Sequence, residues 1–336
     1  ASSGVAYTLD TASPTVSSVA ITSATGIQNS TLNVGDVVSI TVTLSEATLV
    51  TGTPTLDLNV GGSTVQASYA SGSGTTALVF SYTILAAQTD ANGIAIAANS
   101  LALAGGTLKD AAGNAATLTH ALVSDNASYL VDTTAPVQTV SGTLFSADTG
   151  TSSTDLNTKT AAQTITATLS AVLSATEILY GSTDGGTNWT NITAMVSGTA
   201  ISWTGATLTS SNSLKFKIND TASNTDSLTT VAYVLDSTNP ATPTLTLATD
   251  SGSSSDGITN VATVNVSGLE GGATWEYSPD GGTTWNTGSG SSFSLSNGAH
   301  TYAVRQTDLA GNAGTASSGV AYTLDTASPT VSSVAI

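Results

Sequence analysis

The stretch ASSGVAYTLDTASPTVSSVAI, residues 1–21, decides how this chain is organised, because it returns letter for letter at residues 316–336. An exact repeat at both ends is typical of a tandem array, in which each unit is followed by another copy of itself. We therefore interpret the sequence as one period of such an array, with a short part of a neighbouring unit at each end. Its expected partners are neighbouring identical repeats in the same chain.

The segment DTASP within this repeat has relatives further along the chain. A short apolar run comes before each of them, and the proline that follows lacks an N–H and fixes φ, so it interrupts a strand. The related segments are DTTAP at 132–136, DSTNP at 236–240 and DTASP at 325–329. Boundaries at these points predict residues 1–11 as the last strand of a preceding repeat, 12–133 as a long domain, 134–237 and 238–326 as two short domains, and 327–336 as the first strand of the next repeat.

Apolar and polar residues alternate along most of the chain, which predicts β-strands with one buried face. Examples are TVSSVAI at 15–21, VVSITVTL at 37–44 and ALVFSYTI at 77–84. Several short strands in roughly 100–120 residues are typical of an immunoglobulin-like sandwich. The expected fold class is all-β, with tandem immunoglobulin-like β-sandwich domains arranged as a linear rod. The two short domains also share a hairpin with a DGG turn and a tryptophan, at residues 179–191 and 276–287.

The composition excludes several functional classes. Asp and Glu number 22 against 5 Lys and Arg, for a net charge of −17, which argues against nucleic acid and anionic membranes as partners. Cysteine is absent, so neither disulfides nor thiolate chemistry is available. No apolar run approaches the roughly 20 residues of a membrane helix, so we expect no membrane insertion. No signal peptide is recognised, as expected of a sequence that begins inside a repeat, and we expect a monomer.

The acidic residues follow a pattern. An Asp-x-x-x-Asn segment comes before the last strand of each of the three domains. Each last strand ends at a linker aspartate, and the final one is Asp325. In a sandwich, that loop lies at the end where the preceding linker enters. Two units also carry a Glu after their second strand. We therefore expect three clusters: Asp10, Glu46, Asp110 and Asn114; Asp132, Asp220 and Asn224, where the Glu is missing; and Asp236, Glu270, Asp308 and Asn312.

Clustered carboxylates repel each other by roughly 1–4 kcal/mol per pair unless a cation lies among them. Carboxylate, amide and backbone oxygens are the ligands that Ca²⁺ prefers. Taken singly, each aspartate is better explained as a turn residue that caps local backbone. The recurrence beside every linker favours calcium.

A second acidic cluster opens each short domain, toward the end that faces the following linker. Its residues are Asp148 and Asp155 in one domain, and Asp250, Asp256 and Asn260 in the other. They predict another ion site, a contribution to the same junction, or a solvated loop. An EF-hand is excluded because Val261 stands where the bidentate Glu would be required.

Catalysis finds little support, and we expect no enzyme. His120 and His300 have no nucleophile or HExxH partner nearby in sequence, which predicts solvent-facing or strand-edge positions. The four tryptophans could form a sugar-stacking platform, but packing in sandwich cores is the commoner role. These are Trp189, Trp203, Trp275 and Trp285.

The DTTAP-type linkers, the DAAGN and DLAGN loops and the DSGSSSDGITN opening resemble the bacterial immunoglobulin-like repeats of giant type I-secreted surface adhesins, the RTX or biofilm-associated proteins. The resemblance covers essentially the whole chain. It implies an extracellular extender on the bacterial cell surface, stiffened by Ca²⁺ at interdomain junctions, that projects an adhesive domain in adhesion and biofilm formation. The implied ligands are Asp10, Asp110 and Asn114; Asp132, Asp220 and Asn224; and Asp236, Asp308 and Asn312.

The first short domain, residues 134–237, departs from this pattern, because it lacks the Glu and has Ser223 where the other two domains have glycine. Its junction is therefore expected to be weaker or differently built. The alternative function is an immunoglobulin-like or lectin-like module that itself binds a glycan or another surface ligand such as ice. A third is a spacer in an S-layer or beside an enzyme.

Overall fold

The computed structural model describes residues 4, 7–226 and 228–334. Within these residues the fold is all-β, as predicted, with a single short 3-10 helix, η1 (Thr193–Met195). The described part of the chain contains no helix of the length and apolar character needed to cross a bilayer. Every strand ladder described joins strands of the same one of three successive segments.

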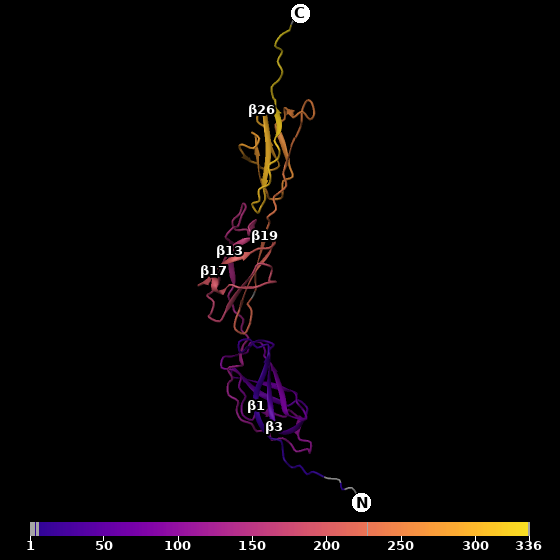
Figure 1. The fold of residues 1–336 in the computed structure, drawn as a ribbon, viewed down its shortest axis with the longest axis vertical. Helices are drawn as coiled ribbons and strands as arrows, with labels where there is room; N and C mark the ends of the chain where they lie inside the picture. The colour runs from indigo at the N-terminus through magenta and orange to yellow at the C-terminus, as the bar shows by residue number, and fades with distance from the viewer. Residues whose placement is uncertain (1–3, 5–6, 227, 335–336) are drawn as a thin grey trace. The chain divides into compact units, whose positions relative to one another are not determined.

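The first segment holds a seven-stranded sheet and a three-stranded sheet. The larger has the order β1-β3-β6-β5-β4-β8 with β9 added on β3, and the smaller has the order β2-β10-β7. Figure 1 shows β1 and β3 side by side, as their antiparallel ladder requires. The strands are β1 (Val16–Thr25), β2 (Thr31–Leu32), β3 (Val37–Thr51), β4 (Thr55–Val60), β5 (Ser63–Ser71), β6 (Thr75–Thr83), β7 (Thr89–Asp90), β8 (Leu101–Ala102), β9 (Thr107–Lys109) and β10 (Leu130–Asp132).

The middle segment holds a four-stranded sheet, β11-β13-β17-β16, and a five-stranded sheet, β12-β19-β18-β14-β15. Its strands are β11 (Val140–Phe145), β12 (Asn157–Thr158), β13 (Ala162–Leu169), β14 (Ile178–Ser182), β15 (Thr190–Asn191), β16 (Val196–Ser197), β17 (Ala200–Thr207), β18 (Asn212–Asn219) and β19 (Thr229–Leu235).

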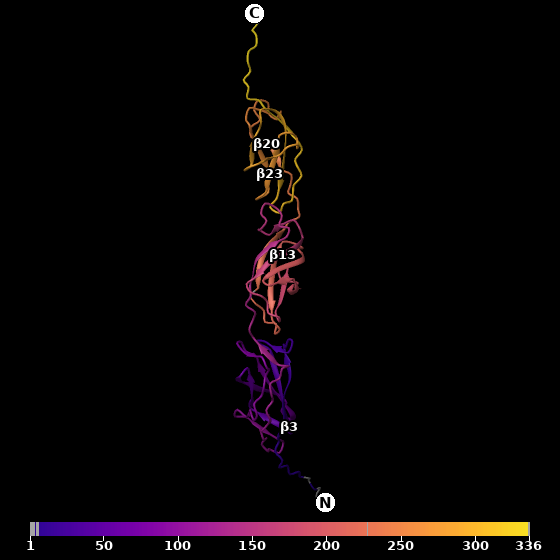
Figure 2. The same ribbon diagram turned by 90° about the vertical axis from the view of Figure 1, so that its left-hand side faces the viewer.

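The third segment holds a three-stranded sheet, β20-β22-β25, and a five-stranded sheet, β21-β27-β26-β23-β24. Figure 2 shows β20 and β23, one strand from each sheet. The strands are β20 (Thr244–Leu247), β21 (Ile258–Thr259), β22 (Thr263–Ser267), β23 (Thr274–Ser278), β24 (Asn286–Thr287), β25 (Ser292–Ser294), β26 (Gly298–Thr307) and β27 (Val320–Leu324).

Hydrophobic cores form between the paired sheets because alternate residues of each strand point inward. In β13, every second side chain from Gln163 to Leu169 is buried. In the first segment, Ile40 and Phe80 of the larger sheet share a core with Leu32 and Val131 of the smaller one. The period-two pattern in the sequence is therefore the pattern of burial.

Residue contacts divide the chain into two compact units. One comprises residues 1–138, 173–179 and 217–227, and the other comprises residues 139–172, 180–216 and 228–336. The first two linkers lie in the first unit with the Asp-x-x-x-Asn loops that contact them, and the third linker lies in the second unit with its loop. The domain boundaries at 133/134 and 237/238 stay predictions.

The exact repeat takes two different conformations. Tyr322 lies in β27 between β26 and β21 and is 8% exposed, whereas the identical Tyr7 lies outside any strand and is 91% exposed. Conversely, Val16 begins β1, but its copy Val331 is outside the strands and 83% exposed. Residues 7–11 and 327–334 lie outside the strands, and residues 1–3, 5, 6, 335 and 336 lie outside the described part of the chain. The assignment of 1–11 and 327–336 to strands of neighbouring repeats stays a prediction.

Candidate metal-binding sites at the linkers

The three Asp-x-x-x-Asn loops share one hydrogen-bonded structure. In the first, Asp110 Oδ1 accepts the backbone N–H of Asn114 at 2.8 Å, and Asp110 Oδ2 accepts its side-chain amide at 2.7 Å. Asp220 with Asn224, and Asp308 with Asn312, repeat both bonds at 2.8–2.9 Å. The loop sequence therefore specifies the same closed turn each time.

The residue before each asparagine is in the left-handed region, with φ of +98° at Gly113, +65° at Ser223 and +87° at Gly311. Glycine adopts this conformation without a Cβ penalty, whereas serine does so at a cost. The turn at Ser223 nevertheless has the same left-handed conformation as the two glycine turns.

Each asparagine also contacts the linker that enters its domain. The side-chain amide of Asn114 donates to the backbone carbonyl of Asp10 at 3.2 Å, and Asn224 and Asn312 do the same to Asp132 and Asp236, both at 2.8 Å. These bonds bring every loop predicted from the sequence to its predicted linker.

The linker aspartates also cap their own turns. One carboxylate oxygen of each accepts the backbone N–H two residues later, at 2.9–3.0 Å, in Asp10, Asp132, Asp236 and Asp325. The turn role considered as the alternative is thus present at all four linkers. Each of these capping bonds uses only one of the two carboxylate oxygens of its aspartate.

The first linker brings three carboxylates together. Asp10, Glu46 and Asp110 offer oxygens that all lie within 4.8 Å of one another, and they form the one group of at least three acidic, His or Cys side chains in this range among the described residues. Glu46 reaches the site from β3 at a register shift, where the strand changes partner from β6 to β9. Asp110 follows β9 directly and is buried.

The electrostatics of this group suit a cation. Partial desolvation, followed by the charges of Asp10 and Asp110, raises the pKa of Glu46 above its ordinary value. Desolvation also acts to raise the pKa of Asp110, but the hydrogen bonds from Asn114, Gly113 and Ala112 outweigh it and lower that pKa. A hard divalent cation would relieve the repulsion, and a set of oxygen donors is what Ca²⁺ requires.

The second linker has a carboxylate that the sequence pattern did not reveal. A cavity of about 310 Å³ is lined by Asp132 and Asp220 and also by Glu177, which lies just before β14. Glu177 Oε2 accepts hydrogen bonds from the Gln138 amide and the Ser174 backbone, both at 2.7 Å. The Glu counted as missing was sought only directly after the second strand, and Glu177 comes later in the same connection.

The third linker assembles only partly. Asp308 and Asn312 are buried beside the carbonyl of Asp236. The backbone N–H of Glu270 donates to Gln306 Oε1, and the Glu270 carbonyl accepts the N–H of Ala273. The Glu270 side chain does not form a three-carboxylate group with the aspartates. The structure thus brings together the predicted Asp and Asn of all three sets, and the predicted Glu only in the first.

In the middle segment, the region of the second acidic cluster contacts the loop at the third linker. Thr149 Oγ1 donates to the carbonyl of Ala310 at 2.5 Å, and Lys159 Nζ donates to that of Gly311 at 2.6 Å. Both acceptors belong to the Asp-x-x-x-Asn loop at the third linker.

The aspartates of this cluster hold backbone turns. Asp148 Oδ2 accepts the N–H of Leu156 at 3.0 Å, and Asp250 Oδ2 accepts that of Ser255 at 2.7 Å. Asp155 and Asp256 each cap the residue two positions later. Asn260 is exposed, and its backbone N–H donates to Ser251.

His120 was expected in a solvent-facing or strand-edge position and is instead buried, outside the strands. Its Nε2 accepts the backbone N–H of Ser100 at 3.0 Å, and its Nδ1 lies 2.9 Å from the carbonyl of Ala121. The expectation was wrong because the ring replaces a backbone partner in an irregular segment, a role that leaves no sequence pattern. His300 lies in β26 and is half-buried.

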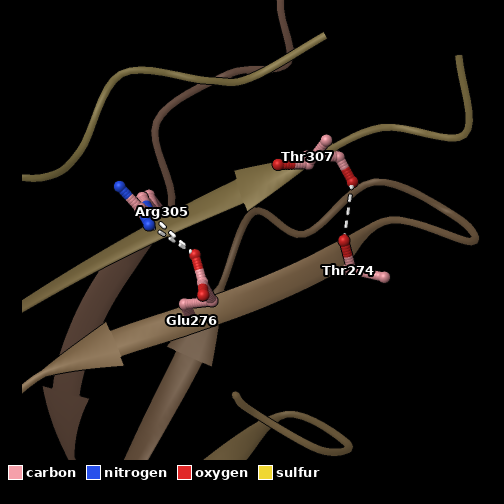
Figure 3. A network of polar contacts seen from close by, with 4 residues as sticks. All are labelled: Thr274, Glu276, Arg305 and Thr307. Atoms are coloured by element: carbon pink, nitrogen blue, oxygen red, sulfur yellow. Dashed lines mark hydrogen bonds and ion pairs between the residues drawn. The ribbon is translucent and has the colours of Figure 1, made fainter. Parts of the chain in front are cut away.

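Core packing is confirmed for two of the tryptophans, since Trp203 and Trp275 are buried. Trp189 and Trp285 are half-buried beside the DGG hairpins. Arg305 lies over the Trp285 ring at 4.1 Å. It also forms a 2.7 Å ion pair with Glu276 on the neighbouring strand (Figure 3). Further along β23 and β26, the hydroxyl of Thr274 donates to the backbone carbonyl of Thr307 at 3.5 Å.

The DGG hairpins contain a side-chain hydrogen-bond network in addition to the turn predicted from the sequence. Asp280 Oδ1 accepts the Ser278 hydroxyl at 2.7 Å and the Thr284 backbone at 2.8 Å. Asp184 makes the equivalent bonds with Ser182 and Asn188. The hydrogen bonds from Asn188 and Thr284 lead the causes that lower the pKa of Asp184 and of Asp280 to about 2.

Neither a protein-family model nor a curated protein sequence matches this chain. Solved structures do. One described as a "tetra-tandem repeat in extending region of large adhesion protein" is similar over 94% of this chain and 74% of its own, at 15% identity and a TM-score of 0.27. A biofilm-associated protein, its BSP domain, is similar over 94% of this chain and 66% of its own, at 10% identity and a TM-score of 0.20.

Fibronectin(III)-like modules of Clostridium thermocellum CbhA are similar over 65% of this chain and 94% of their own, at 11% identity and a TM-score of 0.28. These similarities are too low in identity and TM-score to assign a function to this chain.

Proposed function

We propose that this chain is an extender segment of a bacterial cell-surface adhesin, built of tandem immunoglobulin-like sandwiches that act as a linear rod. Its role is to hold an adhesive domain away from the cell in adhesion and biofilm formation. Ca²⁺ at the linkers stiffens the joints. The exact repeat supports the tandem array, and the similar adhesin structures agree with it.

The observation that carries the proposal is the recurring link between each Asp-x-x-x-Asn loop and the linker before it. Asn114, Asn224 and Asn312 each donate to the carbonyl of a linker aspartate. A spacer needs such contacts at every joint, whereas a ligand-binding module needs one site. The recurrence therefore favours a structural role.

Calcium would be held first by Asp10, Glu46 and Asp110, whose oxygens are already gathered. When bound, the ion neutralises the carboxylates and ties the linker to the domain. Asn114 orients Asp110 by donating to both of its carboxylate oxygens, from its backbone N–H and its side-chain amide, and the same amide donates to the carbonyl of Asp10. Extracellular calcium modules typically bind at about 10⁻⁴–10⁻³ M, so occupancy would follow the medium.

Calcium titration of the full chain by calorimetry tests the site. The Glu46→Gln variant removes one charge from the group and keeps the side-chain shape, so we expect the loss or marked weakening of one binding site. Glu276→Gln is the matched control, because Glu276 pairs with Arg305 away from the linkers. Unchanged binding in Glu46→Gln, or no binding to the unaltered chain at millimolar Ca²⁺, contradicts the calcium proposal.

The glycan-binding alternative has weaker support. Trp203 and Trp275 are buried, and the Trp285 ring is stacked by Arg305. Retention of this chain on immobilised glycans, with loss of retention in Trp285→Ala, would favour that alternative instead.

A further inference from the structure

Each of the three segments contains one parallel strand ladder beside antiparallel ones, and the other parallel pairings among the described residues are isolated bridges. The ladders are β2 with β10, β12 with β19, and β21 with β27. In each, a short strand near the start of the segment lies beside its last strand. The first strand pairs in one sheet, and the chain then crosses to the other sheet to form this contact.

We propose that these parallel pairs are shear clamps, which let each domain resist tension applied at its two ends. The inference rests on the proposed function, since an extender that connects a cell to a surface carries load. It adds a mechanical role that the calcium sites do not supply.

The direction of the strands is the basis of the clamp. The short strand leads back to the N-terminal end of the segment, and the last strand leads on to the next linker. Because the two strands are parallel, tension pulls them in opposite directions along their length. Their hydrogen bonds then bear the load together, whereas an antiparallel hairpin pulled from its open end loses its bonds one at a time.

The clamp bonds recur at equivalent positions. The backbone N–H groups of Leu130, Val234 and Thr323 donate to the residue before each short strand at 2.9–3.0 Å. Those acceptor residues all have left-handed backbones, with φ of +65° at Ser30, +59° at Leu156 and +74° at Gly257. For a branched side chain such as Leu156 this conformation is costly, so it persists only where surrounding contacts enforce it.

The short strands are themselves anchored. Thr158 and Thr259 are buried, and their hydroxyls donate to the carbonyls of Ala147 and Thr249 at 2.6 and 2.7 Å. The N–H of Asp236 donates to the carbonyl of Thr158 at 2.9 Å.

Asp325 donates to Thr259 in the same way, also at 2.9 Å. In these two segments the clamp therefore reaches the linker aspartate, where load would enter. The acidic loops serve the clamp as well, since Asp148 holds the N–H of Leu156.

Single-molecule force spectroscopy on the full chain, held at its two ends, tests the clamp. Val234→Pro removes the N–H that bonds Leu156, and Val234→Ala at the same position keeps it. One backbone hydrogen bond is worth about tenfold in rate. We expect the middle domain of Val234→Pro to unfold about tenfold faster than that of Val234→Ala at equal force, with the other two domains unchanged.

Equal unfolding rates in the two variants would overturn the clamp. Should Val234→Pro fail to fold, the pulling direction supplies the test, because the chain has no native cysteine and handles can be attached at introduced ones. Handles at Thr154→Cys and Thr238→Cys shear the pair, whereas handles at Thr154→Cys and Leu228→Cys peel it from one end. We expect unfolding at least about tenfold faster in the peeling geometry, because forced unfolding follows the unfolding barrier; equal rates would contradict the clamp.

The two proposals fail separately. Absence of calcium binding leaves the force measurement intact, and equal rates under force leave the calcium joints untouched.

Discussion

The side-chain amide of Asn312 donates to the backbone carbonyl of Asp236, 2.8 Å away, although the two residues are 76 positions apart in sequence. The same amide bonds the carboxylate of Asp308 at 2.8 Å. One buried side chain therefore fixes both the turn of its own loop and the linker that enters the domain.

Replacing Asn312 by alanine removes both bonds and leaves the Asp308 carboxylate underpaired. We expect a loss of about 1–3 kcal/mol in the free energy of unfolding of the third domain, measured by urea denaturation. Asn260→Ala is the control, because the Asn260 side chain is exposed, and a surface substitution is expected within about 0.5 kcal/mol of the unaltered protein. Equal stability of the two variants would contradict a structural role for the asparagine.

The repeat provides a matched pair of tyrosines in one chain. Tyr322 is buried and its hydroxyl bonds the carbonyl of Leu245 at 3.2 Å, whereas Tyr7, in the same local sequence, is exposed. We expect Tyr322→Ala to cost about 3–5 kcal/mol of stability, as large buried aromatics do, and Tyr7→Ala to cost almost nothing. Similar thermal unfolding shifts in the two variants would show that the copies share one environment.

Gly288 lies flat against a buried tryptophan. A Cβ added there would come within 2.3 Å of the Trp275 ring, and φ at this glycine is not in the left-handed region. We expect Gly288→Ala to destabilise the third domain by about 1–3 kcal/mol through overpacking. Gly271→Ala is the control, since a Cβ at Gly271 meets nothing within 4 Å; a comparable loss there would contradict the steric explanation.

The two aspartates of the DGG hairpins should stay ionised in the folded protein down to about pH 2. A carboxyl group whose pKa is lowered on folding stabilises the folded state above its unfolded pKa, near 3.9, and loses that contribution as the pH falls through the folded value. For Asp184 and Asp280 the folded pKa is about 2, so the contribution is complete above about pH 4 and is lost progressively as the pH falls from 4 to 2. Carboxyl ¹³C titration by NMR should give midpoints near 2, and midpoints near 3.9 would contradict the network.

Much of the fold follows from the sequence because it depends on local patterns. Alternation along residues 37–44 and 77–84 predicts strands that the structure contains as parts of β3 and β6. The loops at Asp110, Asp220 and Asp308 follow equally from local spacing, since each closes on an asparagine four residues later.

The features that the sequence did not reveal depend on distant partners. Glu177 enters the second linker region from a connection whose path no local pattern specifies. His120 is buried because Ser100, far away in sequence, requires an acceptor. The identical segments at Tyr7 and Tyr322 show the limit most directly, since local sequence cannot decide whether a neighbouring strand is available.

The central claim is that calcium stiffens the linkers. Small-angle X-ray scattering of the full chain in millimolar Ca²⁺ and in chelator tests it most directly. The account predicts a narrower distribution of long interatomic distances, with a greater maximum dimension, when calcium is present. Superimposable scattering curves under the two conditions would contradict it.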